Sequence, residues 1–232
     1  MTSTPTANAD GSSSDVQTYF SKPEHLYPAL DTNNDIPTEQ FISACNGIAE
    51  FVGFLGTAFT PVKNDIAGNV LKVKTKYNLD RENCSTVQKL VETDLSQHGG
   101  RMGIPTEGLL WLKRGLEFML ELLTLMVSDY KESKDKKKTE NLVQTIRKAY
   151  EMTLKRHHGF VSKQLFKLVI HAAPYRKDIL KAVALGQEGK EDLCIDHIAA
   201  HLGNFRANVN SLVQLYYAKG LETPPASTDG SR

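Results

Sequence analysis

Apolar side chains recur every three or four residues along most of the chain, and this helical period is the feature that most constrains the fold. Phe41, Cys45, Ile48 and Val52 show it first, and later segments repeat it. No segment alternates apolar and polar residues over a useful length, so strands are not expected. The sequence therefore predicts an all-α fold, a single domain of about eight helices.

The pattern predicts helices over residues 38–52, 61–77, 85–98, 106–130, 142–173, 178–185 and 192–217. The 142–173 stretch is expected to bend at Gly159, and Thr38 and Thr60 are the expected N-caps of the first two helices. Residues 1–37 and 219–232 are rich in small polar residues and proline, and we expect both to be flexible extensions of a domain covering 38–218. Four apolar residues of the first extension are expected to pack only locally: Tyr19, Phe20, Leu26 and Tyr27.

Charge and cysteine content narrow the class of protein. A formal net charge of +1 gives no overall attraction to nucleic acid. Three cysteines, Cys45, Cys84 and Cys194, lack the spacing of a disulfide framework and fit reduced thiols in a cytoplasmic protein. No secretory signal is expected, and Glu50 interrupts the most apolar stretch, so we expect no membrane span.

A row of polar residues lies on the helix that begins at Pro61. At about 100° per residue, Asp65, Asn69 and Lys72 fall on one face beside an apolar stripe. A carboxylate, an amide and an amine in a row can bind a ligand with several hydroxyl groups. Many amphipathic helices carry a similar solvated border, so this row alone leaves both interpretations open.

The only tryptophan, Trp111, begins an apolar face that includes Gly115 and Phe118. It is either a core residue beside a packing glycine or a flat platform on which a sugar ring stacks. His157 and His158 point about 100° apart, so they cannot bind one metal from the same helix face. His158 shares an apolar stripe, which leaves a core histidine and a ligand-facing one as alternatives.

Several catalytic and metal-binding patterns are incomplete. Cys194, His197 and His201 could supply three zinc ligands, but no second cluster completes a site. The segment Gly186–Lys190 is too short for a phosphate-binding loop. No nucleophile lies in a recognisable context, and the Lys134–Lys138 run is typical of a solvated loop. We therefore expect no metal, no cofactor and no catalytic residue.

Four separated motifs resemble the glycolipid transfer protein family over about residues 38–218. They are Phe59-Thr60-Pro61-Val62-Lys63-x-Asp65-Ile66-x-Gly68-Asn69-x-x-Lys72, Trp111-Leu112-Lys113-Arg114-Gly115-Leu116-x-Phe118, Lys148-Ala149-Tyr150-Glu151-Met152 with His158-Gly159, and Ala172-Ala173-Pro174-Tyr175. The resemblance implies a two-layer helical sandwich that encloses a pocket for lipid chains. It also implies a glycolipid headgroup site formed by Asp65, Asn69, Lys72, Trp111 and His158.

By the same resemblance, Trp111 stacks under the first sugar, Asp65, Asn69 and Lys72 bind polar groups of the headgroup, and His158 binds the ceramide amide oxygen. The implied chain pocket is lined by Phe51, Phe59, Phe118, Leu122, Leu154, Val161 and Phe166. The implied membrane-docking residues are Tyr150, Phe160 and Tyr175.

Substrate class follows from one comparison within the family. The branch that binds ceramide-1-phosphate has a lysine at the position of Asn69 and arginines at those of Trp111 and Gly115. A phosphate requires cations, whereas a neutral sugar requires stacking and neutral polar groups. The chain therefore resembles the glycosphingolipid-binding branch, although Phe160 and His171 replace the tryptophan and tyrosine of familiar animal members.

Three functions follow from the resemblance and the residues. The first is a non-enzymatic carrier that moves a glycosphingolipid between membranes as a monomer with transient membrane contact. The second is a glycolipid sensor or adaptor, in which the terminal extensions recruit partners. The third is a lipid hydrolase that uses His158 and Asp65, but no residue supplies its nucleophile.

Overall fold

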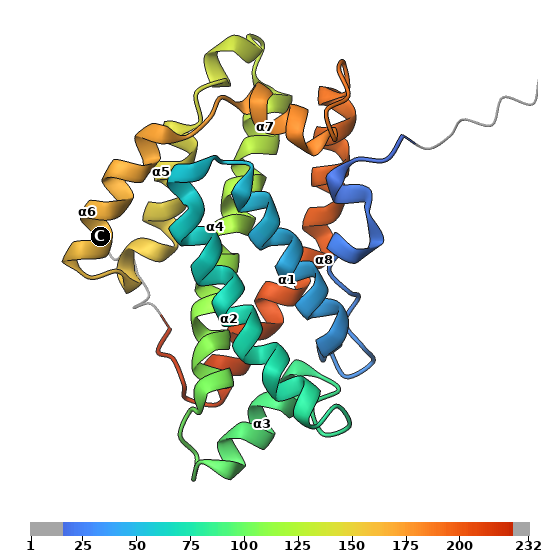
Figure 1. Cartoon of the computed structure of the whole chain (residues 1–232), viewed down its shortest axis with the longest axis vertical. Coiled ribbons are helices and arrows are strands. Elements are labelled where there is room, and N and C mark those ends of the chain that lie inside the picture. The colour runs from blue at the N-terminus through green and yellow to red at the C-terminus, as the bar shows by residue number, and fades with distance from the viewer. Residues whose placement is uncertain (1–15, 225–232) are drawn as a thin grey trace, which may run out of the picture.

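The computed structural model describes residues 16–224, and within this range the protein is all-helical (Figure 1). The α-helices are α1 (Thr38–Gly53), α2 (Thr60–Leu79), α3 (Val87–Gln97), α4 (Ile104–Glu132), α5 (Val143–Met152), α6 (Phe160–Val169), α7 (Arg176–Val183) and α8 (Glu191–Ala218). The described residues form no strand, only isolated bridges between Pro37 and Thr86 and between Asn141 and Tyr175. The prediction of an all-α fold is confirmed. Residues 1–15 and 225–232 of the expected extensions lie outside the described range.

Short 3-10 segments connect these helices: η1 (Tyr19–Ser21), η2 (Pro23–His25), η3 (Thr57–Phe59), η4 (Lys136–Thr139), η5 (Leu154–His157) and η6 (Ile170–Ala172). None of the helices in the described range is long and apolar enough to cross a lipid bilayer.

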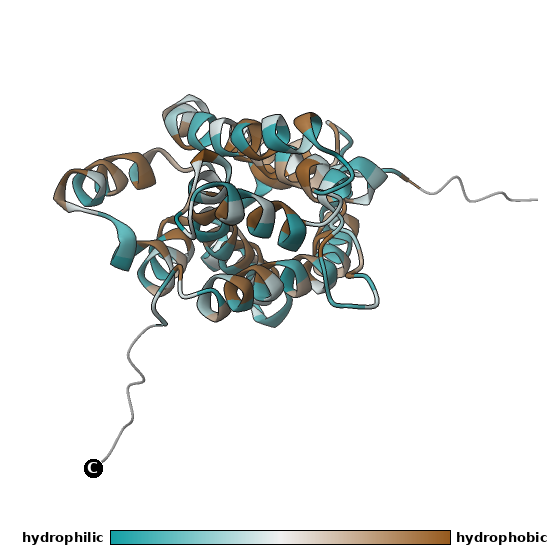
Figure 2. Ribbon diagram, turned by 90° about the horizontal axis from the view of Figure 1, so that it is seen from below, coloured by the Kyte–Doolittle hydropathy of each residue, from teal (hydrophilic) through white to brown (hydrophobic). Residues whose placement is uncertain are grey.

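The helices form two layers, as predicted. α1 and α2 cross in front of α4 and α8 in Figure 1, and α2 packs on both α1 and α4. Phe41, Leu109, Leu116 and Phe205 are completely buried between the layers. In Figure 2, the ribbons lie in two rows with α6 standing away from them at one side. The core is therefore the α1–α2–α4–α8 region, and α6 is attached at its margin.

The expected helix over 142–173 is wrong as one element, because the chain leaves helical geometry twice. At Thr153 the backbone has φ −124° and ψ −81°, and the Thr153 hydroxyl donates to the Ala149 carbonyl at 2.7 Å. A β-branched residue that hydrogen-bonds locally in this way favours helix termination. Gly159 is then extended, with φ −71° and ψ −178°, and precedes α6. The outcome is two separate helices rather than a bend at Gly159.

The expectation of flexibility over residues 1–37 is wrong for the segment that contains η1 and η2. Tyr19, Phe20 and Tyr27 are buried in the main core. The Tyr27 ring stacks on Phe205 of α8 with centroids 4.4 Å apart. Isolated aromatic residues bury large apolar areas without any helical period, which explains why the sequence pattern did not predict this packing.

The expected N-caps are also wrong. Pro37 and Phe59 occupy the N-cap positions of α1 and α2, and neither makes a side-chain capping bond. Thr38 is buried inside α1, and its hydroxyl donates to the Cys84 carbonyl at 2.7 Å. Thr60 is the first residue of α2, followed by the proline that fits the first turn.

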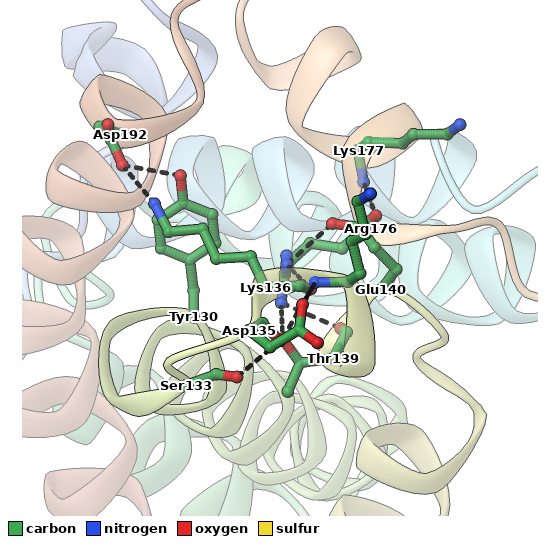
Figure 3. A network of polar contacts seen from close by, with 10 residues as sticks. Tyr130, Ser133, Asp135, Lys136, Thr139, Glu140, Arg176, Lys177 and Asp192 are labelled. Carbon is green, nitrogen blue, oxygen red and sulfur yellow. Dashed lines mark hydrogen bonds and ion pairs between the residues drawn. The ribbon is translucent and has the colours of Figure 1, made fainter.

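The lysine-rich connection contains η4, and its four lysines are all exposed, as expected for a solvated segment: Lys134, Lys136, Lys137 and Lys138. Arg176 at the start of α7 is fully buried and donates to the Thr139 and Lys136 carbonyls at 2.9 and 2.8 Å, and to the Glu140 carboxylate at 2.8 Å (Figure 3). The Lys136 ammonium lies 3.8 Å from the Tyr130 ring centroid. The buried Arg176 guanidinium thus donates hydrogen bonds to backbone carbonyls of η4.

Candidate headgroup site

The polar row on α2 is a connected chain of hydrogen bonds. The Asn69 amide donates to Asp65 Oδ2 at 3.5 Å, and Lys72 Nζ donates to Asn69 Oδ1 at 3.0 Å. Asn69 is only 4% exposed, whereas Asp65 and Lys72 are exposed. The row therefore presents a carboxylate and an ammonium to solvent, held in register by a buried amide between them.

Gly108 lets α4 approach this row closely, and Gly115 lies further along the same helix face. A Cβ at Gly108 would lie 2.8 Å from Lys72 Cδ and 3.5 Å from the Asn69 carbonyl oxygen. A Cβ at Gly115 would meet Ile66 at 4.0 Å. The two helices are thus antiparallel here, and Trp111, one turn from each glycine, lies on the α4 face beside α2.

Trp111 is 37% exposed, so it is neither a core residue nor a free surface residue. The Arg114 guanidinium carbon lies 4.6 Å from the centroid of its ring, a cation–π contact. An arginine on one face of an indole leaves the opposite face to accept a planar apolar surface, such as the C–H face of a sugar.

His158 belongs to the junction between η5 and α6, and its Nδ1 lies 3.1 Å from the Tyr150 hydroxyl. The pKa of His158 is lowered, chiefly by burial. The Asp65 carboxylate raises this pKa, and the Lys163 ammonium lowers it further. The η5 segment that leads into this junction packs on α4, the helix that also contacts α2. Since the imidazole is held neutral, it has one donor and one acceptor nitrogen at neutral pH.

The five predicted headgroup residues therefore come from three neighbouring parts of the fold. α2 supplies Asp65, Asn69 and Lys72, α4 supplies Trp111, and the η5–α6 junction supplies His158. We refer to these five residues as the headgroup cluster.

Two of the residues predicted from the family lie elsewhere than expected. Tyr150 was expected to dock on a membrane, but it is buried and stacks on Phe166 with ring centroids 3.6 Å apart. Val161 was expected in the chain pocket, but its side chain is 79% exposed. Both differences have the same cause, because α6 turns Phe166 toward the body of the protein and Val161 away from it.

The other predicted pocket residues are inside or against the core. Phe51, Phe59, Phe118 and Leu122 are buried, and Leu154 and Phe166 are partly buried against them. Phe166 meets Phe118 edge-on, with centroids 6.5 Å apart, and so links α6 to α4. Phe160 and Tyr175, which were predicted to dock on a membrane, are exposed.

A groove of 560 Å³ lies between α5 and α6. Tyr150, Phe166 and Ile170 contribute its apolar lining, and Arg147, Lys163 and Lys167 are among its cationic residues. The outer face of α6 is apolar as well, because Phe160, Val161, Leu165 and Leu168 are all exposed. Apolar and cationic groups therefore meet at one margin of the fold.

The sequence pattern did not predict a buried ionic cluster beside Trp111. Lys113 is fully buried and donates to the carboxylate of Glu222, a residue of the expected C-terminal tail. Glu222 also accepts from Arg114 Nε at 2.9 Å. The expectation of a flexible tail is therefore wrong at Glu222. The only local indication that Glu222 is buried is the apolar residue before it, Leu221. The partners of Glu222 lie more than a hundred positions earlier in the sequence.

Two residues of the incomplete zinc pattern make other contacts. Cys194 donates to the Leu180 carbonyl, and His201 packs among Phe20, Tyr27 and Phe205. Among residues 16–224, no three His, Cys, Asp or Glu side chains form a group able to hold a metal ion.

Comparison with known proteins gives one consistent answer. Residues 36–185 match the family model described as glycolipid transfer protein. A zebrafish (Danio rerio) protein named glycolipid transfer protein is 36% identical over 198 residues, which cover 83% of this chain and 92% of that protein.

Two solved structures share both the fold and sequence similarity. A structure of FAPP2, described as selecting simple glycosphingolipids with this fold, is 31% identical, covers 89% of this chain and 98% of its own, and has a TM-score of 0.77. The fungal glycolipid transfer protein HET-C2 is also 31% identical, covers 85% of this chain and 94% of its own, and has a TM-score of 0.71. The chain belongs to the glycolipid transfer protein family.

Proposed function

We propose that this protein binds one glycosphingolipid and carries it between membranes without changing it chemically. The observation that carries the proposal is the headgroup cluster, in which a half-exposed tryptophan lies beside a hydrogen-bonded acid–amide–amine row. Sugars present both C–H faces and hydroxyl groups, and this cluster offers a partner for each. The zebrafish relative and HET-C2 are named glycolipid transfer proteins, and FAPP2 is described as selecting simple glycosphingolipids, which supports the same ligand class here.

Each member of the cluster has a distinct role in this proposal. The first sugar stacks on the face of Trp111 opposite Arg114. Asp65 accepts from sugar hydroxyls, Lys72 donates to sugar oxygens, and Asn69 holds both in register. His158 binds the ceramide amide, with Tyr150 fixing the ring through Nδ1.

The lipid chains enter the interior at the α6 margin. No residue of α6 is fully buried, and Phe166 joins it to Phe118 and Tyr150. Displacing α6 therefore breaks few buried contacts, and it opens a path toward Phe118 and Leu122. Each methylene moved from water into such an apolar site contributes ~0.8 kcal/mol, so a long chain retains a strong preference for the interior.

The same margin is the surface that meets a membrane. Phe160 is 76% exposed at the start of α6, and Leu168 is exposed near its end. Lys163 and Lys167 lie on the same helix and line the neighbouring groove. Apolar insertion combined with cationic residues favours transient binding to a lipid surface. We place the protein in the cytoplasm as a monomer that contacts membranes through this face.

The proposal is tested with Trp111→Ala in a glycolipid transfer assay between donor and acceptor vesicles. Losing the stacking contact removes about 1 kcal/mol or more, so binding falls about fivefold or more. Leu79→Ala, which truncates an exposed apolar residue at the far end of α2, is the matched control and keeps wild-type transfer. Unchanged transfer by Trp111→Ala would refute the headgroup assignment.

Mass spectrometry of lipid recovered from the acceptor vesicles distinguishes a carrier from an enzyme. The recovered glycosphingolipid keeps the mass that it had in the donor vesicles. A hydrolysed sugar or a free fatty acid that appears only with protein present contradicts the carrier mechanism.

A further inference from the structure

The ionic cluster around Glu222 joins the C-terminal segment to the elements that hold the headgroup cluster. The Glu222 side chain is 6% exposed, although it follows the end of α8. Its carboxylate accepts from Lys113 Nζ and from the Arg114 guanidinium, with Nη2 2.8 Å away. Burial alone raises the pKa of Glu222, but the hydrogen bonds from Lys113 and Arg114 outweigh it, so the pKa is lowered and the carboxylate is charged.

This cluster is adjacent to the proposed sugar site on two sides. Arg114 lies over the ring of Trp111. His157 Nδ1 lies 3.8 Å from Glu222, and His157 directly precedes His158. Glu222 therefore contacts residues next to two members of the headgroup cluster without belonging to it.

The charges around Glu222 nearly balance. The cations are Lys113, Arg114 and Arg156, and the anions are Glu222 and Glu117, which lies 3.1 Å from Lys113 and 3.8 Å from Arg156. Burial is the main reason why the pKa of His157 is lowered to about 4, and the positive charges of Arg114 and Arg156 add to it. Glu222 raises this pKa by a smaller amount, so the His157 ring is neutral at pH 7. Removing the Glu222 charge leaves a surplus of two positive charges beside Trp111.

We propose that Glu222 determines headgroup specificity by neutralising Arg114 and Lys113, so that the site favours a neutral sugar over an anionic headgroup. The inference rests on the proposed function, because it assumes that the sugar binds at Trp111. A phosphate or sulfate gains from an uncompensated arginine, whereas a neutral sugar does not. The neutral site is therefore produced by the C-terminal segment as well as by the residues of α2 and α4.

The test compares Glu222→Gln with wild type for three ligands in neutral vesicles: galactosylceramide, its sulfated form, and ceramide-1-phosphate. Trp111 is the only tryptophan, so its fluorescence reports binding at this site. In Glu222→Gln, the affinity for both anionic lipids relative to galactosylceramide rises by about tenfold, the scale of one uncompensated charge at a partly buried site. A rise for only one of them identifies whether sulfate or phosphate fits the geometry, and still supports the proposal.

Glu188→Gln is the matched control, because it makes the same charge change at an exposed position and leaves the ratio unchanged. Arg114→Gln provides an independent arm that shifts the ratio in the opposite direction. An unchanged ratio in Glu222→Gln, or an equal loss of all three ligands, would overturn the proposal. Arg114→Gln decides the question in the same way if Glu222→Gln does not fold.

Failure of the proposed function gives a different result. In that case wild type and Glu188→Gln show no fluorescence response to galactosylceramide. When both respond and only the Glu222→Gln ratio stays unchanged, the sugar site is retained and the specificity role of Glu222 is rejected.

Discussion

Gly108→Ala isolates the close approach of α4 to the α2 row. The new Cβ lies 2.8 Å from Lys72 Cδ and 3.1 Å from Lys72 Cβ. The side chain of Lys72 can rotate away from the first contact. The second contact is 0.3 Å below the 3.4 Å limit of ordinary packing, and Lys72 Cβ moves only when α2 moves.

Two opposing free energies decide the effect on stability. Replacing a helical glycine by alanine stabilises the folded state by about 1 kcal/mol. Overpacking at a close contact costs about 1–3 kcal/mol. The free energy of unfolding therefore changes by about 0 to −2 kcal/mol, which leaves the protein folded.

Ligand binding is expected to change as well, because Lys72 belongs to the proposed headgroup site. Rotation of Lys72 carries its ammonium, which hydrogen-bonds Asn69 at 3.0 Å, away from the proposed sugar oxygens. A hydrogen bond from a charged group to the ligand contributes about 1.5–3 kcal/mol. Glycolipid binding is expected to fall by about tenfold to a hundredfold. The assay measures urea-induced unfolding and vesicle-to-vesicle transfer on the same preparation.

Gly203→Ala is the matched control for this prediction. Gly203 lies within α8, and a Cβ there meets no atom within 4 Å. This variant gains the full helix contribution of about 1 kcal/mol and keeps wild-type transfer. If Gly108→Ala gains as much stability as Gly203→Ala and transfers glycolipid normally, the argument for a close α2–α4 contact at the headgroup site is wrong.

Three further predictions address other parts of the fold. Burial lowers the pKa of His201 from 6.5 to about 4, so the unfolded chain takes up a proton below pH 6.5 and the free energy of unfolding decreases as the pH falls to 4. In His201→Leu, the decrease in the free energy of unfolding between pH 7 and 4 is expected to be smaller than in wild type by ~3 kcal/mol. Parallel pH profiles of the two proteins would contradict this. Tyr150→Phe frees the His158 ring and weakens glycolipid binding by about 1 kcal/mol in fluorescence titrations, and full affinity would remove its positioning role. Thr38→Val leaves the buried Cys84 carbonyl without its hydroxyl donor and lowers the free energy of unfolding by about 1–3 kcal/mol in urea, whereas an unchanged midpoint would show that the bond is dispensable.

Helix positions were predictable because local period alone determines them. The expected 106–130 helix corresponds to α4, Ile104–Glu132, and the expected 192–217 helix to α8, Glu191–Ala218. The Asp65–Asn69–Lys72 row was predictable for the same reason, since three residues at four- and three-residue spacing share a helix face. Whether a row is solvated or faces another element depends on that other element, and only the structure places Gly108 beside it.

Long-range partners were not predictable from local pattern. Glu222 lies in a polar tail, and its burial depends on Lys113, more than a hundred residues earlier. From the sequence, Lys113 is expected to be solvated like its neighbour Arg114, because lysine is almost never fully buried unless it is paired. Its partner, Glu222, cannot be identified from the local sequence. The segment with Tyr19 and Phe20 fails in the same way, since its packing surface is formed by α1 and α8.

The stripe on α6 shows a different limit of sequence pattern. Val161, Leu165 and Leu168 have the spacing of a core-facing stripe, yet all three are exposed. A helical period indicates that a face meets an apolar environment, but it does not say whether protein or lipid supplies that environment. In a protein that exchanges lipid between its interior and a membrane, both do so in turn. The exposed stripe, the few buried contacts of α6 and the adjacent lysines therefore all support the proposal that this helix exchanges protein packing for lipid.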